Sequence, residues 1–155
     1  MRGKTALGVK AMRLSTKGRY AVMAMADLAR CEVRADRATA LAEIAHRQEI
    51  SLSYLEQLFA RLRRKGLVTS ARGPGGGYRL ARSAEDTKIS DIIHAVDEPL
   101  RATRCARSKG CMTKGERCLT HDLWEDLGQR IEDYLASVSL ADVVAGRLSS
   151  DRRAA

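Results

Sequence analysis

The chain has 155 residues, of which 45% are hydrophobic and 30% charged, and a formal net charge of +9 at pH 7. This length can bury a hydrophobic core in one domain or in two closely packed small ones. No apolar run approaches the roughly 18 to 20 residues that cross a bilayer, and Lys10, Arg13 and Lys17 interrupt any signal-peptide core. We therefore expect a cytoplasmic protein with no membrane partner.

The positive charge lies in the N-terminal half. Residues 1–82 carry 17 Lys and Arg against 6 Asp and Glu, a balance of +11, whereas residues 83–155 carry 11 against 13, a balance of −2. Cations aligned on phosphates release condensed counterions, so the basic half is a candidate surface for double-stranded DNA. A solvated basic surface explains the charge alone equally well.

Residues 1–11 lack apolar periodicity and are expected to form a basic N-terminal extension. Apolar residues then recur with helical spacing over residues 18–30, which predicts a first helix. Ser15 and Thr16 can cap it, and Lys17 and Arg19 lie where an N-terminal arm would meet phosphates.

Two further helices joined by a short turn predict a helix-turn-helix. The first of them starts at Thr39, and residues 48–51 supply the turn. The second carries an unbroken apolar stripe and ends at Gly66; the stripe consists of Leu52, Leu55, Leu58, Phe59 and Leu62.

After Gly66 the sequence pattern changes to that of two strands, residues 67–71 and 78–81. A glycine-rich loop, residues 72–77, joins them and can approach a surface closely because its glycines lack a Cβ. A hairpin directly after a helix-turn-helix is the wing of a winged helix. An ordinary flexible turn is the alternative, and a nucleotide-binding loop is disfavoured because no Gly-Lys-Ser/Thr ending follows.

The C-terminal half predicts three helices. Ser90 caps a short one, and Ser139 and Asp142 form a capping box for the last one, residues 140–148. The long helix between them begins at Thr120 and carries a nearly coiled-coil seam that we expect at a dimer interface. The seam residues are Trp124, Leu127, Ile131, Tyr134, Leu135 and Val138.

The expected fold class is therefore mainly α with a small β wing, a winged helix-turn-helix followed by a long dimerisation helix. The predicted organisation is an extension (1–11), a winged-helix DNA-binding domain (12–82), a metal loop with dimerisation helices (83–148) and a disordered tail (149–155).

Three of the four cysteines and one histidine gather in residues 105–121. Thiolates and imidazole are ligands for borderline and soft metals, and the metal candidates are Cys105, Cys111, Cys118 and His121. Their spacing is wider than the Cys-x2-Cys of most structural zinc sites, which favours an iron-sulfur cluster over zinc. Thiol switching and inert thiols remain alternatives. Cys31 is expected to be a small buried hydrophobe. His46 and His94 are expected to be surface residues or helix residues with satisfied hydrogen bonds.

Several segments resemble a known family, the Rrf-two winged-helix transcription factors, in its branch of iron-sulfur cluster regulators. The segments are MRLSTKGRYAVMAMADLA, ISLSYLEQLFARLRRKGLV, ARGPGGGYRLAR, DIIHAVDE, ATRC and CLTHDLW, and the resemblance runs from Met12 to about Val144. It implies a homodimeric regulator with a 2Fe-2S cluster on three Cys and one His, whose occupancy changes the DNA sites bound. The interval between Cys111 and Cys118 is one residue longer than in the family pattern. The loop around residues 34–38 is about two residues longer. Nitric-oxide-sensing relatives lack a histidine at the position of His121.

In a winged helix the third helix enters the major groove and its N-terminal residues meet base edges. This places Ser51, Ser53, Tyr54, Glu56 and Gln57 at the DNA. Gln57 can pair with adenine, and Glu56 would reject acceptor-rich sites. A capping box with Ser53 is the structural alternative for Glu56. In the resembling family the matching glutamate restricts site choice until the cluster is bound.

The wing and the end of the third helix supply the other DNA candidates. Arg72 would enter the minor groove, and the wing glycines that allow close approach are Gly73, Gly75 and Gly76. Arg61, with the cations of residues 63–65, can contact phosphates, although a solvated basic face explains each one equally well.

The leading hypothesis is a cluster-sensing DNA-binding regulator. The alternatives are a zinc-stabilised, thiol-redox or nitric-oxide-responsive regulator of the same fold, and an iron-sulfur carrier or redox enzyme. Catalysis is disfavoured because no nucleophile-base pair or cofactor fingerprint is present.

Overall fold

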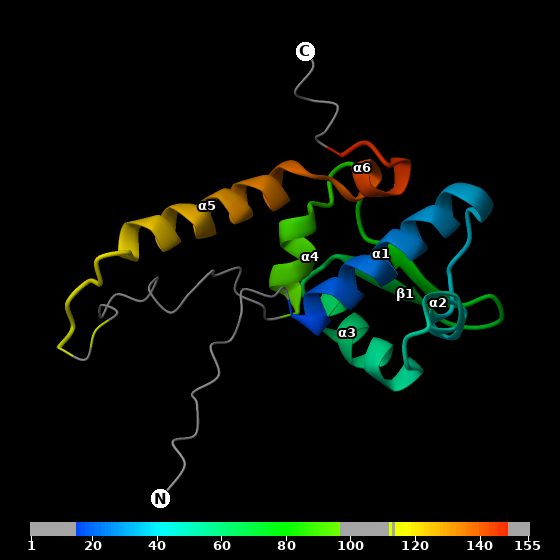
Figure 1. Ribbon diagram of the computed structural model, residues 1–155. Helices are drawn as coiled ribbons and strands as arrows, with labels where there is room; N and C mark the ends of the chain where they lie inside the picture. The colour runs from blue at the N-terminus through cyan, green and yellow to red at the C-terminus, as the bar shows by residue number, and fades with distance from the viewer. Residues whose placement is uncertain (1–14, 97–111, 113, 149–155) are drawn as a thin grey trace, which may run out of the picture.

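The computed structural model describes residues 15–96, 112 and 114–148 (Figure 1). These residues form six helices and one two-stranded antiparallel sheet. The elements in chain order are α1 (Thr16–Ala35), α2 (Leu41–Gln48), α3 (Leu52–Arg64), β1 (Val68–Ala71), β2 (Gly77–Leu80), α4 (Ile89–Ala95), α5 (His121–Ser137) and α6 (Leu140–Ala145). The mainly helical fold with a small wing is confirmed.

Helix α1 is the element against which most of the others pack. Its first turn is capped by Ser15, whose Oγ accepts a hydrogen bond from the Gly18 amide at 3.3 Å, as expected. One face is buried, including Met25 and Leu28, and this face contacts α2, α3, α4, α6 and β2. The helix also runs five residues beyond the predicted end at Arg30, to Ala35.

The helix-turn-helix is formed by α2 and α3. Glu49 takes a left-handed conformation (φ 54°) in the turn, and Ser51 caps α3 by accepting from the Tyr54 amide at 3.2 Å. The stripe of α3 is buried except for Leu52, which is 42% exposed because the first turn extends past the edge of the core.

Thr39 does not start α2, and that prediction is wrong. Its amide donates to the Tyr78 carbonyl at 2.9 Å, and its own carbonyl accepts from the Tyr78 amide at 2.8 Å. Thr39 therefore adds a bridge to the wing, in which β1 pairs with β2 from Val68↔Leu80 to Ala71↔Gly77. Helix α2 begins after Ala40 without a side-chain cap.

Ser90 does not cap α4 either; it is buried within the helix, and Lys88 holds the N-cap position. The Ile89 amide donates instead to the Val138 carbonyl at 3.0 Å, and the Leu140 amide to the Thr87 carbonyl at 2.8 Å. This bridge ties the start of α4 to the start of α6. The capping box of Ser139 and Asp142 is confirmed, and α6 ends at Ala145 rather than at residue 148.

A single hydrophobic core joins the two halves of the chain. Its buried cluster includes α1 and α3 residues together with Ile92, Val138 and Leu140. The core therefore continues across residue 82, the boundary expected between two functional halves of one unit. Helix α5 projects from this body as an arm (Figure 1). None of the described helices is both long and apolar enough to span a membrane.

Gly77 provides a test of how the wing is attached. Its φ is +150°, and a Cβ there would collide with the carbonyl group of Thr39. We expect Gly77→Ala to lower the free energy of unfolding by about 2–4 kcal/mol, measured by urea denaturation. Gly75→Ala is the control, since its φ is +74° but its Cβ meets nothing within 4 Å; it should lose only about 1 kcal/mol. Equal losses would contradict the close approach.

Candidate DNA-binding face and metal centre

The N-terminal end of α3 presents polar side chains to solvent. Ser51, Ser53, Glu56 and Gln57 are exposed, because Leu55, Leu58 and Phe59 turn the opposite face into the core. Tyr54 is half-buried and packs edge-to-face on Tyr20 of α1, with ring centroids 5.9 Å apart. Its ring thus packs α3 against α1, a contact that the sequence pattern did not predict.

The structural alternative for Glu56 is excluded. Ser51 is the N-cap of α3, so the third helical position, from which a capping-box carboxylate reaches back, is Tyr54. Glu56 lies two residues further along the helix and is exposed.

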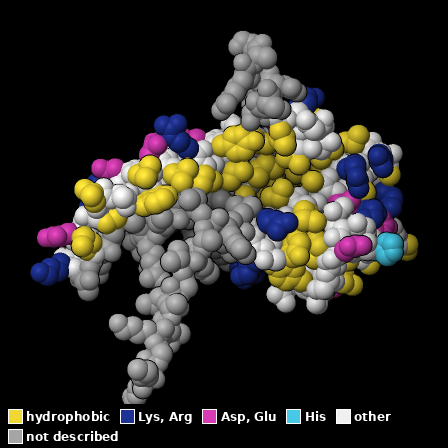
Figure 2. Space-filling model, in the orientation of Figure 1, with side chains coloured by type: hydrophobic (Ala, Val, Ile, Leu, Met, Phe, Trp, Pro, Cys, Tyr) yellow, Lys and Arg dark blue, Asp and Glu magenta, His cyan; other side chains and the backbone are white. Residues whose placement is uncertain are grey.

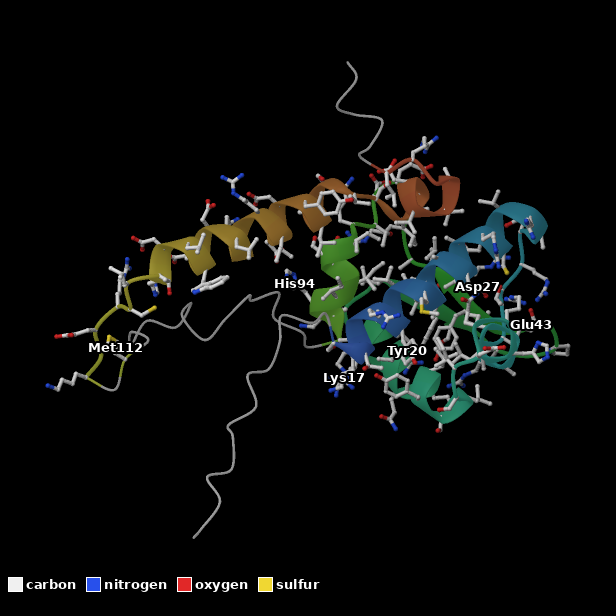
Figure 3. The ribbon with its side chains drawn as sticks, viewed as in Figure 1. Lys17, Tyr20, Asp27, Glu43, His94 and Met112 are labelled. Carbon is white, nitrogen blue, oxygen red and sulfur yellow. The ribbon has the colours of Figure 1, made fainter. Side chains whose placement is uncertain are left out.

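The wing and the start of α1 expose the remaining DNA candidates. Arg72, Gly73 and Gly75 are exposed and Gly76 is half-buried; the Gly76 amide closes the turn on the Gly73 carbonyl at 2.8 Å. Lys17 and Arg19 are exposed at the start of α1, where Figure 3 labels Lys17.

Arg61 differs from the other cations of α3. It is half-buried, and its Nη1 donates to the carbonyl of Val96, at the end of α4, at 3.4 Å. The side chain therefore links the third helix to α4.

The metal candidates fall partly within the described residues. Cys118 and His121 lie in the turn that starts α5, where the backbone amide of His121 donates to the backbone carbonyl of Cys118 at 3.0 Å. The Cys118 thiol contacts Oγ1 of Thr120 at 3.7 Å. His121 is 5% exposed and Cys118 is half-buried. Cys105 and Cys111 lie outside the described residues. In the interval after Cys111 a turn forms around Gly115 (φ 81°), whose amide donates to the Met112 carbonyl at 2.9 Å.

Sequence reasoning missed the acidic neighbours of His121. Its Nε2 lies 3.5 Å from Oε2 of Glu125, one helical turn further on. Ligand atoms of His121, Asp122 and Glu125 all lie within 4.8 Å of one another. The i, i+4 spacing of His121 and Glu125 on a predicted helix was the signal that could have revealed this contact.

Most residues of the predicted seam lie on α5 and are at least partly exposed to solvent. Within α5 only His121 is buried, while Leu123 is 59% and Tyr134 45% exposed. Figure 2 shows hydrophobic side chains spaced along this helix. The half-buried seam residues are Trp124, Leu127, Ile131 and Leu135.

Val138 is a correction to the predicted seam. It follows the last residue of α5 and is 3% exposed, because it packs in the hydrophobic core of the same chain. It has no surface left for a second chain.

A polar contact joins the arm to the body at α4. His94 Nε2 lies 3.1 Å from Oε2 of Glu132, and Figure 3 shows His94 on the side of α4 that faces α5. His94 is a surface residue, as expected, but it carries this contact.

The exposed start of α3, the helix-turn-helix and the two-stranded wing together define a winged-helix DNA-binding protein. The family model of Rrf2, described as an iron-dependent transcriptional regulator, matches residues 14–146. The chain belongs to the Rrf2 family of transcriptional regulators.

Two relatives named HTH-type transcriptional regulator IscR are similar over nearly the whole chain. That of Photorhabdus laumondii is 51% identical over 152 residues, covering 93% of this chain and 91% of the relative. That of Xenorhabdus nematophila is 52% identical over 150 residues, covering 92% and 90%. These relatives are named as regulators, not as enzymes.

Solved structures agree with the fold. IscR of T. potens superimposes with a TM-score of 0.70 at 38% identity, covering 94% of this chain and 93% of that one. CymR of B. subtilis, titled the global cysteine regulator, gives a TM-score of 0.72 at 32% identity, covering 86% and 96%.

Proposed function

We propose that this regulator senses iron-sulfur cluster status through a 2Fe-2S cluster held by Cys105, Cys111, Cys118 and His121, and that it controls genes of cluster biogenesis. The observation that carries the proposal is that one backbone turn at the start of α5 holds Cys118 three residues before a buried His121. Similarity to regulators named IscR supports it.

The proposed ligands have the chemistry that a 2Fe-2S cluster requires. Three thiolates and one imidazole are suitable ligands for iron, and a histidine in place of a thiolate raises the reduction potential of a bound cluster. The imidazole must be deprotonated to bind. The Glu125 carboxylate beside Nε2 can orient the His121 ring, as outer carboxylates do for metal-binding histidines.

The fold connects this site to the proposed reading helix. His121 begins α5, Glu132 of α5 contacts His94 of α4, and Arg61 of α3 donates to the carbonyl that ends α4. Binding of a cluster would therefore constrain the first turn of α5, whose other end packs on the DNA-binding body. This supports a mechanism in which cluster occupancy alters site selection.

The half-buried apolar seam of α5 supports a homodimer. A lone amphipathic helix gains stability when a partner covers its apolar face. Two copies joined along α5 would present two α3 helices to the successive half-sites of an operator.

At the DNA we propose that Gln57 and Glu56 face base edges, Arg72 enters the minor groove, and Lys17 and Arg19 contact phosphates. Their exposure on one basic half of the chain supports these roles.

The first prediction concerns the cluster. Protein purified without oxygen should show the visible absorption of a 2Fe-2S cluster, with equal iron and acid-labile sulfide. Cys111→Ala, Cys118→Ala and His121→Ala should lose it, yet still bind some DNA sites. Cys31→Ser is the matched control and should retain it, because Cys31 lies on α1.

A colourless wild-type protein with stoichiometric zinc would overturn the cluster in favour of the zinc-stabilised alternative. Loss of binding at every DNA site in the cysteine variants would contradict two modes of site selection.

The second prediction concerns Glu56. Glu56→Ala should broaden the set of duplexes bound, with discrimination between preferred and rejected sites falling by about 1–3 kcal/mol, measured by competition binding in the cluster-free form. Glu85→Ala, an exposed acid distant in sequence from α3, is the control. If both variants select DNA sites with the same selectivity, Glu56 does not contribute to recognition at the DNA interface.

The third prediction concerns the seam. Leu127→Glu places a charge among the apolar residues of α5 and should convert a dimer to a monomer, measured by analytical ultracentrifugation. Ala136→Glu, on the opposite exposed face of the same helix, should remain dimeric. A dimeric Leu127→Glu variant would show that another surface joins the subunits.

A further inference from the structure

Asp27 is a carboxylate buried on the packed face of α1. Its side chain is fully buried, between the core residues Met25 and Leu28 in sequence. A buried carboxylate is strongly unfavourable unless it is paired and hydrogen-bonded. The position therefore requires partners on the elements that cover it.

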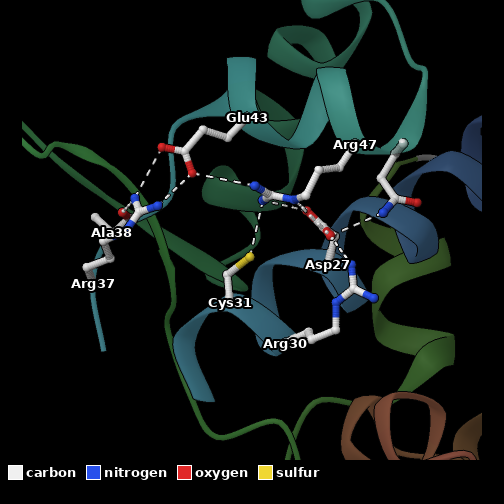
Figure 4. Close-up of polar contacts among 8 residues, drawn as sticks. Asp27, Arg30, Cys31, Arg37, Ala38, Glu43 and Arg47 are labelled. Atoms are coloured by element: carbon white, nitrogen blue, oxygen red, sulfur yellow. Dashed lines mark hydrogen bonds and ion pairs between the residues drawn. The ribbon is translucent and has the colours of Figure 1, made fainter. Parts of the chain in front are cut away.

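Those partners come mainly from the end of α2 (Figure 4). Arg47 donates to Oδ2 of Asp27 through Nη2 at 2.8 Å and through Nε at 3.0 Å. Gln48 Nε2 donates to Oδ1 at 3.1 Å, and Arg30 of α1 adds a contact to Oδ1 at 2.9 Å. Arg47 and Gln48 are the last two residues of α2, so one carboxylate holds the helix end through two consecutive side chains.

Arg47 is held from other directions as well. Its Nη2 donates to Sγ of Cys31 at 3.1 Å, and its Nη1 lies 3.6 Å from Glu43, which also pairs with Arg37 at 2.9 Å. The hydrogen bonds with Asp27 raise the pKa of Arg47, and those with Arg37 lower the pKa of Glu43. Cys31 is thus half-buried beside a guanidinium, not the small buried hydrophobe that was predicted.

The end of α2 leads directly into the reading helix. After Gln48 come Glu49 in the left-handed conformation and Ile50, which is 6% exposed and donates its amide to the Ala45 carbonyl at 3.1 Å. The next residue, Ser51, caps α3. This turn is short and held at both ends, so a displacement of Gln48 displaces the first turn of α3.

Apolar packing and the Asp27 contacts constrain α3 differently. Leu55, Leu58 and Phe59 hold its axis on the core, but hydrophobic contacts are non-directional and tolerate small rotations. Charge-assisted hydrogen bonds to a carboxylate fix both distance and angle.

We propose that Asp27 is a positioning residue for DNA recognition, which sets the placement of the first turn of α3 by binding Arg47 and Gln48. Asp27 itself is buried and contacts no DNA. The inference rests on the proposed reading of bases by α3.

The test compares specific with non-specific binding. A random duplex pool selected with the wild-type full chain supplies the specific probe, and a scrambled duplex of equal composition supplies the non-specific one. Asp27→Asn should weaken binding of the selected duplex by about tenfold, the effect of losing a base contact. Binding of the scrambled duplex and the salt dependence should not change, because they report phosphate contacts.

A purely structural role would not change the ratio of the two affinities. Leu140→Ala, in α6, removes a buried side chain without touching α2, and it serves as a control of lowered thermal stability. Both variants are measured well below their unfolding temperatures, verified by circular dichroism. Cys31→Ser removes a sulfur contact of Arg47 and leaves Asp27 in place, so it should retain the wild-type ratio.

Gln48→Ala provides a second variant should Asp27→Asn fail to fold. It removes one hydrogen bond and should reduce the ratio by about threefold. If the wild type selects a sequence but Asp27→Asn or Gln48→Ala leaves the ratio of specific to non-specific affinity unchanged, the positioning role is overturned and the proposed function is not. A wild type that selects no sequence overturns the proposed function together with this inference.

Discussion

Packing against α1 is the constraint on which the rest of this structure depends. Its buried face contacts α2, α3, α4, α6 and the wing. The elements proposed to read DNA and those that anchor the arm are therefore positioned by the same helix. Apolar burial supplies most of the stabilisation but specifies little about rotation or register. Directional contacts supply that information: the Ser51 cap, the bridge between Thr39 and Tyr78, and the bonds of Asp27.

Helix α5 is the exception to this arrangement, because the body buries little of its surface. A helix of 17 residues in isolation is marginally stable in water, so the arm depends on its anchor near Val138 and on whatever covers its seam. The contact of His94 with Glu132 is partly exposed and contributes little energy by itself. Coupling between the proposed metal centre and α3 would therefore be carried by packing of α5 on α4, with the contact between His94 and Glu132 setting the orientation of α5.

Local sequence patterns were sufficient to predict most of the fold. Stripes with helical spacing marked α1, α3 and α5; the glycine-rich hairpin marked the wing; and Ser139 with Asp142 marked the start of α6. Each of these signals involves residues within a few positions of one another, which is why no knowledge of distant contacts was needed. The grouping of thiols with His121 was equally visible, since metal ligands contributed by one loop are close in sequence.

Tertiary structure alone decided the features that depend on distant partners. Thr39 and Ser90 have the chemistry of helix caps, but one pairs with the wing and the other is buried within α4. Val138 follows the spacing of the seam yet turns into the core, and Asp27 sits among apolar residues because the end of α2 satisfies its charge. By itself the sequence determined which segments are helices and which form the wing, and it marked the candidate metal ligands. Which polar groups pair across the core is set by long-range packing, because a local pattern records the chemistry of a side chain and not its partner.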